Sequence, residues 1–258
     1  MLPSLFLSHG APVLSLTDAP ARHFLEGLGQ AFEQPRAILV ASAHWETPTP
    51  RLNAVASNDT IHDFYGFPAP LYALRYPAPG APELAARIVA RLEAAGFTAG
   101  LDPQRGLDHG AWVPLRMMYP AADLPVLQVS VQSDAGPAHH LRLGRALAPL
   151  RADGVLVIGS GSFTHDLRRF RGQPIDTPES ADVTAFADWM DAALRDGRED
   201  DLLHYRDRAP FARDNHPTEE HLLPLFVALG AGGAEPRVER LHRSTTYGML
   251  RMDAYAFQ

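Results

Sequence analysis

Short apolar runs alternate with amphipathic segments along most of this chain. Runs such as "ILVAS" and "VLVIG" are typical of buried strands, whereas apolar residues at four-residue spacing, as at Leu84, Ile88 and Leu92, predict a helix. The pattern predicts strands at residues 4–8, 37–43, 51–57, 126–132, 155–159 and 238–256, the last a hairpin broken near Ser244 to Tyr247. It predicts helices near residues 18–31, 82–95, 110–118, 138–151, 180–195 and 218–229.

This alternation predicts an α/β fold with three layers. Near-continuous apolar strands are buried on both faces, which favours a largely parallel or mixed central sheet flanked by helices on both faces. A chain of 258 residues can form one large domain or two small ones. We find no internal repeat, low-complexity tract or linker, and we therefore expect a single domain over residues 1–258.

Three of the predicted strands lead to a histidine. His9 follows "LFLS", His44 follows "ILVASA", and His165 follows "VLVIGSGSFT". Ligands of open α/β sheets gather beyond the carboxyl ends of the strands, so one fold can bring these side chains together. His221, in the first turn of the helix predicted at residues 218–229, is a fourth candidate. One such histidine alone is more often structural, and the case for a site depends on the set.

Composition narrows the chemistry of such a site. The chain has no cysteine and all of its 23 basic residues are arginine, which excludes thiolate ligands, a cysteine nucleophile and Schiff-base catalysis. Histidine and carboxylate remain as metal ligands, and imidazole suits both zinc and iron.

The net charge of −7 gives no basic surface for nucleic acid or an anionic membrane. No apolar run approaches the roughly 18 residues that span a bilayer, and "LPSLFL" is too short for the core of a signal peptide. We expect a cytoplasmic protein that binds neither nucleic acid nor membrane.

Two common catalytic motifs are absent at the end of the strand at residues 155–159. Ile158 stands where a nucleophile elbow around Ser160 requires glycine, and Thr164 stands at the third glycine of a dinucleotide-binding loop. We expect Gly159 and Gly161 instead to let another segment approach the backbone closely.

Two loop stretches combine histidine with aromatic residues, "TIHDFYGFP" and "LDHGAW". They have a structural interpretation, in which the aromatic side chains anchor a loop and Asp108 caps a helix. They also have a functional one, in which they form an aromatic-lined substrate pocket with His109 as a polar contact. The sequence leaves both open.

Six segments in order, "LFLSHGAP", "ASAHWE", "IHDFYGFP", "LDHGAW", "GSGSFTHDL" and "HPTEEHLLPL", resemble the class III (LigB-like) extradiol ring-cleavage dioxygenases. Their branch of DOPA 4,5-dioxygenase-type proteins is the most similar. The resemblance runs from about residue 3 to residue 257, so it implies one LigB-like catalytic domain over residues 1–258. It also implies an α/β sheet flanked by helices.

The resemblance implies a non-haem metal held by His9, His44 and His221, with His165 as the catalytic acid/base. Glu219 and Glu220 lie beside His221, and either is an alternative third ligand. Fe(II) is expected for activity, and Zn(II) is expected to occupy the same site. The substrate contacts that the resemblance implies are His109, His62, Tyr65 and Trp112, with Phe64 as a further wall residue.

The implied reaction opens the ring of a catechol with O2. One alternative is a zinc-dependent hydrolase on the same scaffold, which would use the three histidines to generate hydroxide. Another is a non-catalytic metal-binding relative. Which catechol is cleaved, at which bond, and in what oligomeric state are left open by the sequence.

Overall fold

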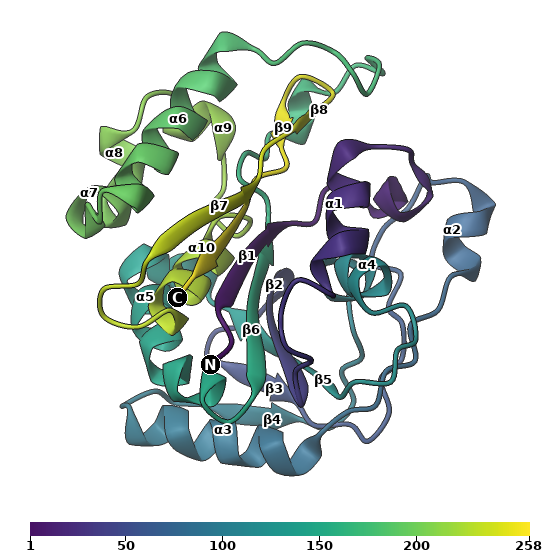
Figure 1. Cartoon of the computed structure of the whole chain (residues 1–258), viewed down its shortest axis with the longest axis vertical. Coiled ribbons are helices and arrows are strands. Elements are labelled where there is room, and N and C mark those ends of the chain that lie inside the picture. The colour runs from purple at the N-terminus through teal and green to yellow at the C-terminus, as the bar shows by residue number, and fades with distance from the viewer.

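The computed structural model describes residues 1–258, and a mixed eight-stranded sheet forms its centre (Figure 1). The strand order is β4-β3-β5-β2-β6-β1-β10-β7. A separate two-stranded sheet pairs β8 with β9. The strands are β1 (Ser4–Ser8), β2 (Ala37–Glu46), β3 (Arg51–Asn53), β4 (Gly100–Asp102), β5 (Val126–Val131), β6 (Val155–Gly161), β7 (Val238–His242), β8 (Thr245–Thr246), β9 (Leu250–Arg251) and β10 (Ala254–Phe257).

Helices cover both faces of the sheet. One face carries α1 and α4, and the other carries α3, α5 and α10, while α6 to α9 extend beyond it next to β7 (Figure 1). The α-helices are α1 (Pro20–Leu28), α2 (Ala69–Ala73), α3 (Pro82–Ala94), α4 (His109–Met118), α5 (Gly136–Leu147), α6 (Ala181–Arg195), α7 (Glu199–Leu203), α8 (Tyr205–Arg208), α9 (Ala212–Asn215) and α10 (Leu223–Ala231). Four short 3-10 helices are η1 (Pro12–Leu16), η2 (Ser133–Ala135), η3 (Ala148–Arg151) and η4 (Leu167–Arg169). None of these helices combines the length and apolar character needed to cross a lipid bilayer.

Side chains of the central strands alternate between the two helical layers, as the pleat of a strand requires. Leu156 and Ile158 of β6 pack in the core beneath α1 and α4. Val155 and Val157 of the same strand pack against α3, α5 and α10. The strand is therefore buried on both faces, which explains its continuous apolar sequence and confirms the predicted three-layer α/β fold.

The sheet brings the three predicted histidines together at the carboxyl ends of its central strands. The strands β2, β6 and β1 are adjacent and parallel, with Ser42 paired to Ser160 and Ser8 to Gly161. Their carboxyl ends consequently lie side by side. His44 lies near the end of β2, and the segments that follow β1 and β6 carry His9 and His165 to the same region, as we predicted.

Several element boundaries differ from the prediction. The strand expected at residues 51–57 ends at Asn53, and the helix expected at 218–229 begins only at Leu223. A helix over 218–229 would place Pro224 in its interior, where proline lacks an N–H and clashes with the carbonyl four residues earlier. Pro224 lies instead in the first turn of α10, where its missing N–H costs nothing. His221 therefore precedes the helix.

Other segments were predicted more closely. The region at residues 238–256 forms the antiparallel pair β7 and β10, interrupted by the small hairpin of β8 and β9. Gly10 has a φ of +65°, and a Cβ there would lie 2.7 Å from the side chain of Met252. The turn after β1 thus requires glycine.

Candidate metal centre

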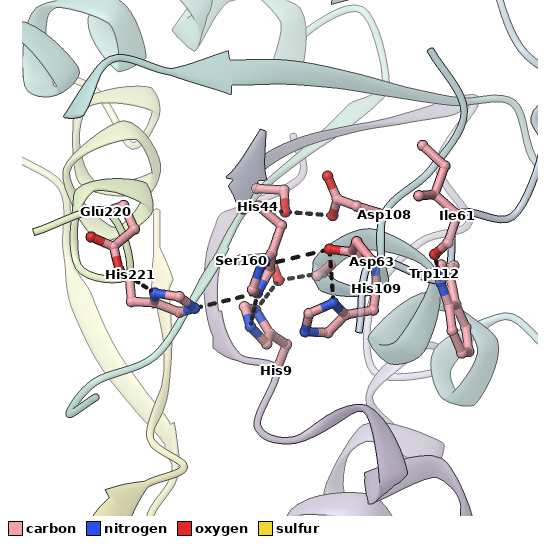
Figure 2. Close-up of polar contacts among 12 residues, drawn as sticks. His9, His44, Ile61, Asp63, Asp108, His109, Trp112, Ser160, Glu220 and His221 are labelled. Carbon is pink, nitrogen blue, oxygen red and sulfur yellow. Dashed lines mark hydrogen bonds and ion pairs between the residues drawn. The ribbon is translucent and has the colours of Figure 1, made fainter. Parts of the chain in front are cut away.

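Three imidazole rings converge beyond the carboxyl ends of β1 and β2. The Nε2 atom of His44 lies 3.0 Å from Nε2 of His9 and 3.3 Å from Nε2 of His221. Figure 2 shows the contacts that join His44 to each of the other two rings. His9 and His221 are 2% and 5% exposed, whereas His44 is partly exposed toward the open side of the cluster.

Hydrogen bonds fix the protonation of the two outer rings. The hydroxyl of Ser160 donates to the carbonyl of Gly110, so its oxygen accepts a hydrogen bond from Nδ1–H of His9 at 3.0 Å. Nδ1–H of His221 donates to Oε1 of Glu220 at 2.9 Å. In the neutral rings of His9 and His221 the proton is thus on Nδ1, and Nε2 presents its lone pair toward His44.

This donor set fits a metal ion. Metal–imidazole bonds of about 2.0–2.1 Å place neighbouring nitrogens about 2.8–3.4 Å apart at angles between about 90° and 110°, a range that includes both separations from His44. Converging lone pairs repel one another unless a cation lies between them. The hydrogen bonds on Nδ1 of His9 and His221 are the outer contacts by which metal-binding histidines are oriented.

The rings are held in the neutral form that metals bind. Burial, reinforced by the neighbouring imidazoles, lowers the pKa of His9 and of His221 well below the usual value. Burial together with the proximity of His109 lowers the pKa of His44 to about 3. Protons therefore do not compete with a metal for these nitrogens at neutral pH.

An irregularity in β2 positions His44. The pairing with β5 shifts between Ser42 and Glu46, so His44 lies in a bulge within the strand, not beyond it. The hydroxyl of Ser42 donates to Oδ1 of Asp108 at 2.6 Å and accepts from the backbone N–H of His44 at 3.2 Å. Asp108 precedes α4, yet its carboxylate caps no N–H of that helix and instead binds β2 and Gln128 of β5.

Glycines of β6 position His221. A Cβ on Gly161 would lie 2.1 Å from the carbonyl oxygen of His221, and one on Gly159 would lie 2.0 Å from that of Pro224. The N–H of Ser162 donates to the His221 carbonyl at 2.8 Å. The expectation that these glycines permit a close backbone approach is confirmed, and the approaching segment is the one that carries His221.

His165 stacks on His221, with ring centroids 3.5 Å apart and planes inclined by 11°. Its backbone N–H donates to the carbonyl of Asn215. Burial lowers the pKa of His165 to about 4, so the ring is neutral at pH 7 and able to accept a proton.

Asp63 contacts both His44 and His109, away from the stacked pair of His165 and His221. Its Oδ1 accepts the backbone N–H of His109 at 3.0 Å, while Oδ2 lies 3.0 Å from Nδ1 of His109 and 3.7 Å from Nδ1 of His44. Burial raises the pKa of Asp63, but the contacts with His109 outweigh it and lower that pKa to about 2. The carboxylate is therefore ionised and orients the ring of His109 (Figure 2).

A cavity of about 430 Å³ opens over these residues, a volume suited to a small organic ligand. Its lining includes the candidate ligands together with His165, His109 and Asp63. Phe64 and Tyr65 also line it, and Tyr65 is 92% exposed at its mouth.

Two predicted substrate contacts, Trp112 and His62, are not among the residues that line this cavity. Trp112 is fully buried, and its indole N–H donates to the carbonyl of Ile61 at 2.9 Å. His62 points to the carbonyl of Leu74, 3.1 Å from its Nε2. Both side chains anchor the loop that presents Asp63 and Phe64, which is the structural interpretation of that stretch.

The two glutamates beside His221 have different surroundings. Oε1 of Glu219 accepts the hydroxyl of Tyr205 at 3.0 Å, within the packing of α8. Glu220 lies next to both His221 and His165, and its Oε1 is engaged by Nδ1 of His221. In this arrangement Glu220 orients the ring of His221.

Sequence reasoning did not identify Asp63 or Ser160 as parts of the site. In the sequence, Asp63 is only one member of an aromatic-rich loop stretch. Ser160 lies in a buried strand, where a serine usually bonds to the backbone. No periodicity connects either residue to its histidine, because the contacts join segments 46 and 151 residues apart.

Comparisons with known proteins agree with this geometry. Residues 3–258 match the family model of the catalytic LigB subunit of aromatic ring-opening dioxygenase. The chain is 46% identical to a 4,5-DOPA dioxygenase extradiol of Beta vulgaris, over 98% of this chain and 96% of that protein. It is 40% identical to a 4,5-DOPA dioxygenase extradiol of Escherichia coli K12, over 91% of this chain and 87% of that protein. A crystal structure of an uncharacterized protein from Escherichia coli K12 aligns over 100% of both chains, with a TM-score of 0.82 and 32% identity.

These matches confirm the predicted enzyme class, an extradiol dioxygenase that opens aromatic rings, and the zinc-hydrolase alternative is not favoured. A non-haem metal, a small aromatic substrate and O2 belong to that class, and the histidine cluster accommodates the metal. The chain belongs to the LigB family of aromatic ring-opening dioxygenases.

Proposed function

We propose that this protein opens a catechol of the DOPA type next to its diol, with one Fe(II) held by His9, His44 and His221. His165 serves as the acid/base, and His109 contacts the substrate. Residues 1–258 act as a single catalytic domain. Relatives named 4,5-DOPA dioxygenase extradiol, at 40–46% identity, support the choice of a DOPA-type catechol.

The convergence of three Nε2 atoms at the base of a cavity carries this proposal. Three neutral imidazoles leave further coordination positions open, as a metal that must meet both a catechol and O2 requires. Iron bound there would supply the electron transfer between catechol and O2 that zinc, lacking redox chemistry, does not supply.

The side chains around the three histidines have separate roles in the proposed reaction. His165, stacked against His221 and neutral at pH 7, is placed to take the proton that a catechol hydroxyl loses on binding and to return it as the ring opens. Asp63 contacts Nδ1 of His109, so the edge of the His109 ring that carries Nε2 is free to contact the substrate in the cavity. The burial of His9 and His221 limits the contact of these two rings with bulk water.

Oxygen uptake with a catechol panel tests the proposal. Protein reconstituted anaerobically with Fe(II) is mixed with DOPA, catechol or protocatechuate in aerated buffer, and oxygen consumption is followed with the visible spectrum. We expect one O2 consumed per molecule of yellow ring-opened product with at least one of them. Zinc-loaded protein is the control and should consume none. Absence of oxygen uptake with every catechol, in protein shown to contain one Fe(II) per chain, would contradict the proposal.

A further inference from the structure

The hairpin of β8 and β9 forms one wall of the cavity. Tyr247 and Met249 in its turn, together with Leu250 at the start of β9, are among the lining residues. The ring of Tyr247 meets that of Phe170 edge to face, with centroids 5.2 Å apart, and Phe170 lines the cavity as well. The hairpin and the segment after His165 therefore meet in one aromatic wall.

Tyr247 has a backbone conformation that residues other than glycine rarely adopt. Its φ is +56°, and that of Gly248 is +68°. The N–H of Met249 donates to the carbonyl of Thr246 at 3.3 Å, so the two left-handed residues are the central pair of a tight turn. Glycine, asparagine and aspartate are typical of the first of these positions, whereas a tyrosine there costs free energy. The fold thus keeps a tyrosine where glycine would relieve strain.

The location of this strain connects it with ligand binding. Three residues other than glycine have a positive φ, namely Ala122, Phe211 and Tyr247, and of these only Tyr247 lines the cavity. Strained residues persist where the surrounding structure holds them, and they gather at sites that bind ligands. The cavity therefore gains from the tyrosine side chain what the turn loses.

Hydrogen bonds from the segment before α6 hold this turn in place. The N–H of Tyr247 donates to the carbonyl of Ile175 at 2.9 Å, and the side-chain amide of Gln173 donates to the carbonyl of Tyr247 at 3.1 Å. The N–H of Ser180 donates to the carbonyl of Gly248 at 3.0 Å. The ring of Tyr247 is thus presented from a fixed backbone.

The hydroxyl of Tyr247 is available to a ligand. Of the other hydroxyl groups that line the cavity, that of Ser162 donates to the carbonyl of Thr164 at 2.7 Å, and Tyr65 is 92% exposed at the mouth. Tyr247 is partly buried, and its hydroxyl is paired with no protein group. A tyrosine hydroxyl can both donate and accept a hydrogen bond.

A catechol that binds through its diol at the base of the cavity directs its ring substituent away from the three histidines, toward the cavity walls. We propose that Tyr247 determines which ring substituent the cavity accepts: its ring packs against the substituent, and its hydroxyl bonds to the polar end. This inference rests on the proposed ring-opening function and assigns a specificity-determining residue to it.

Three variants of Tyr247 test this. Tyr247→Gly and Tyr247→Asn remove the ring but tolerate a left-handed backbone, and Tyr247→Phe removes only the hydroxyl. In Fe(II)-reconstituted protein, kcat/KM is measured by oxygen uptake for unsubstituted catechol and for the substituted catechol that the wild type uses best. We expect the ratio of substituted to unsubstituted kcat/KM to fall at least about tenfold without the ring and about threefold without the hydroxyl, mainly through KM.

Two further measurements separate this role from a structural one. Dissociation constants from calorimetry on zinc-loaded protein, which does not turn over, should show the same loss of selectivity. The metal content and the urea midpoint of Tyr247→Gly should be no lower than in the wild type, because relief of strain offsets the lost contact with Phe170. Phe211→Gly is the matched control, since Phe211 has a φ of +54° and is 51% exposed outside the cavity lining. Its selectivity should be unchanged.

The possible results are distinguishable. If the iron-loaded wild type turns over no catechol, the proposed function fails. If it turns over catechols and the ratio is unchanged in Tyr247→Gly and Tyr247→Asn, the function stands and this inference is overturned. Turnover of unsubstituted catechol alone overturns it as well. Loss of fold or of metal in both small variants would make Tyr247 a structural residue and also contradict the inference. A wild-type ratio in Tyr247→Phe would overturn the role assigned to the hydroxyl.

Discussion

At the scale of single residues, one hydrogen bond orients each of the two outer histidines of the cluster. Ser160 holds Nδ1 of His9, and Glu220 holds Nδ1 of His221. Such contacts fix the ring and leave Nε2 for the metal, and their removal typically costs 10–100-fold in metal affinity, on the order of 1–3 kcal/mol.

The two neighbouring glutamates allow a matched test of this dependence. We expect Glu220→Ala to weaken metal binding by about 10–100-fold, because His221 loses the partner that orients it. Glu220→Gln should retain metal, since an amide oxygen still accepts the Nδ1–H. Glu219→Ala is the control, because Glu219 bonds to Tyr205 instead. Affinities come from competition with a chelator, and complete loss of metal in Glu220→Gln would make Glu220 a ligand.

Asp63 permits a second test at this scale. In Asp63→Asn the amide can still accept the backbone N–H of His109, but it no longer provides a charged acceptor opposite Nδ1. We expect kcat to fall about tenfold or more with the metal content unchanged, because the ring of His109 is misoriented. Asp59→Asn, on the exposed part of the same loop, serves as the control. A normal kcat in Asp63→Asn would show that turnover does not depend on the contact of Asp63 with His109.

At the scale of elements, the apolar pattern predicted the strands that lead to the site but not the details that complete it. The end of β1 and the chain path to His165 follow from local sequence, because a buried strand is encoded by its own apolar run. The bulge at His44 was not predicted, and the hydrogen bond of Ser42 beside it joins Asp108, 66 residues away, a contact that local sequence does not reveal. Trp112 was expected among the substrate contacts because sequence does not show which way an aromatic side chain of a helix points.

The close approach of the His221 segment to Gly161, at the end of β6, allows a test of how β6 positions that segment. In Gly161→Ala the new methyl would lie 2.1 Å from the carbonyl oxygen of His221, so the segment before α10 must move and carry His221 with it. We expect loss of most bound metal and a free energy of unfolding lower by about 1–3 kcal/mol, measured by urea denaturation. Gly27→Ala is the control, because a Cβ there has no neighbour within 4 Å. Normal metal content in Gly161→Ala would show that the position of His221 does not depend on this contact.

At the scale of the whole molecule, buried neutral histidines couple stability to pH. Burial lowers the pKa of His140 to about 4, and its Nε2 accepts the N–H of Gln132 while Nδ1–H donates to the carbonyl of Gly136. Between pH 6.5 and about 4 the unfolded chain binds a proton at this position that the folded protein excludes. Stability is therefore full above the unfolded pKa and falls as the pH decreases.

Urea denaturation of the metal-free protein at pH 7 and pH 5 measures this coupling. The folded and unfolded pKa values predict a loss of about 2 kcal/mol attributable to His140 between these two pH values. His140→Asn should be less stable at pH 7 but show a pH dependence smaller by that amount. The other buried histidines are common to both proteins, so the difference isolates His140. An unchanged pH dependence in the variant would contradict the assignment.

In the proposed site His9, His44 and His221 hold the metal while His165 acts on the substrate. Its most direct test is the metal content and turnover of four alanine variants after identical anaerobic Fe(II) reconstitution. We predict that His9→Ala, His44→Ala and His221→Ala each lose bound iron. We predict that His165→Ala keeps one iron per chain and loses oxygen uptake with a catechol. A His44→Ala protein that retained its iron would contradict the account.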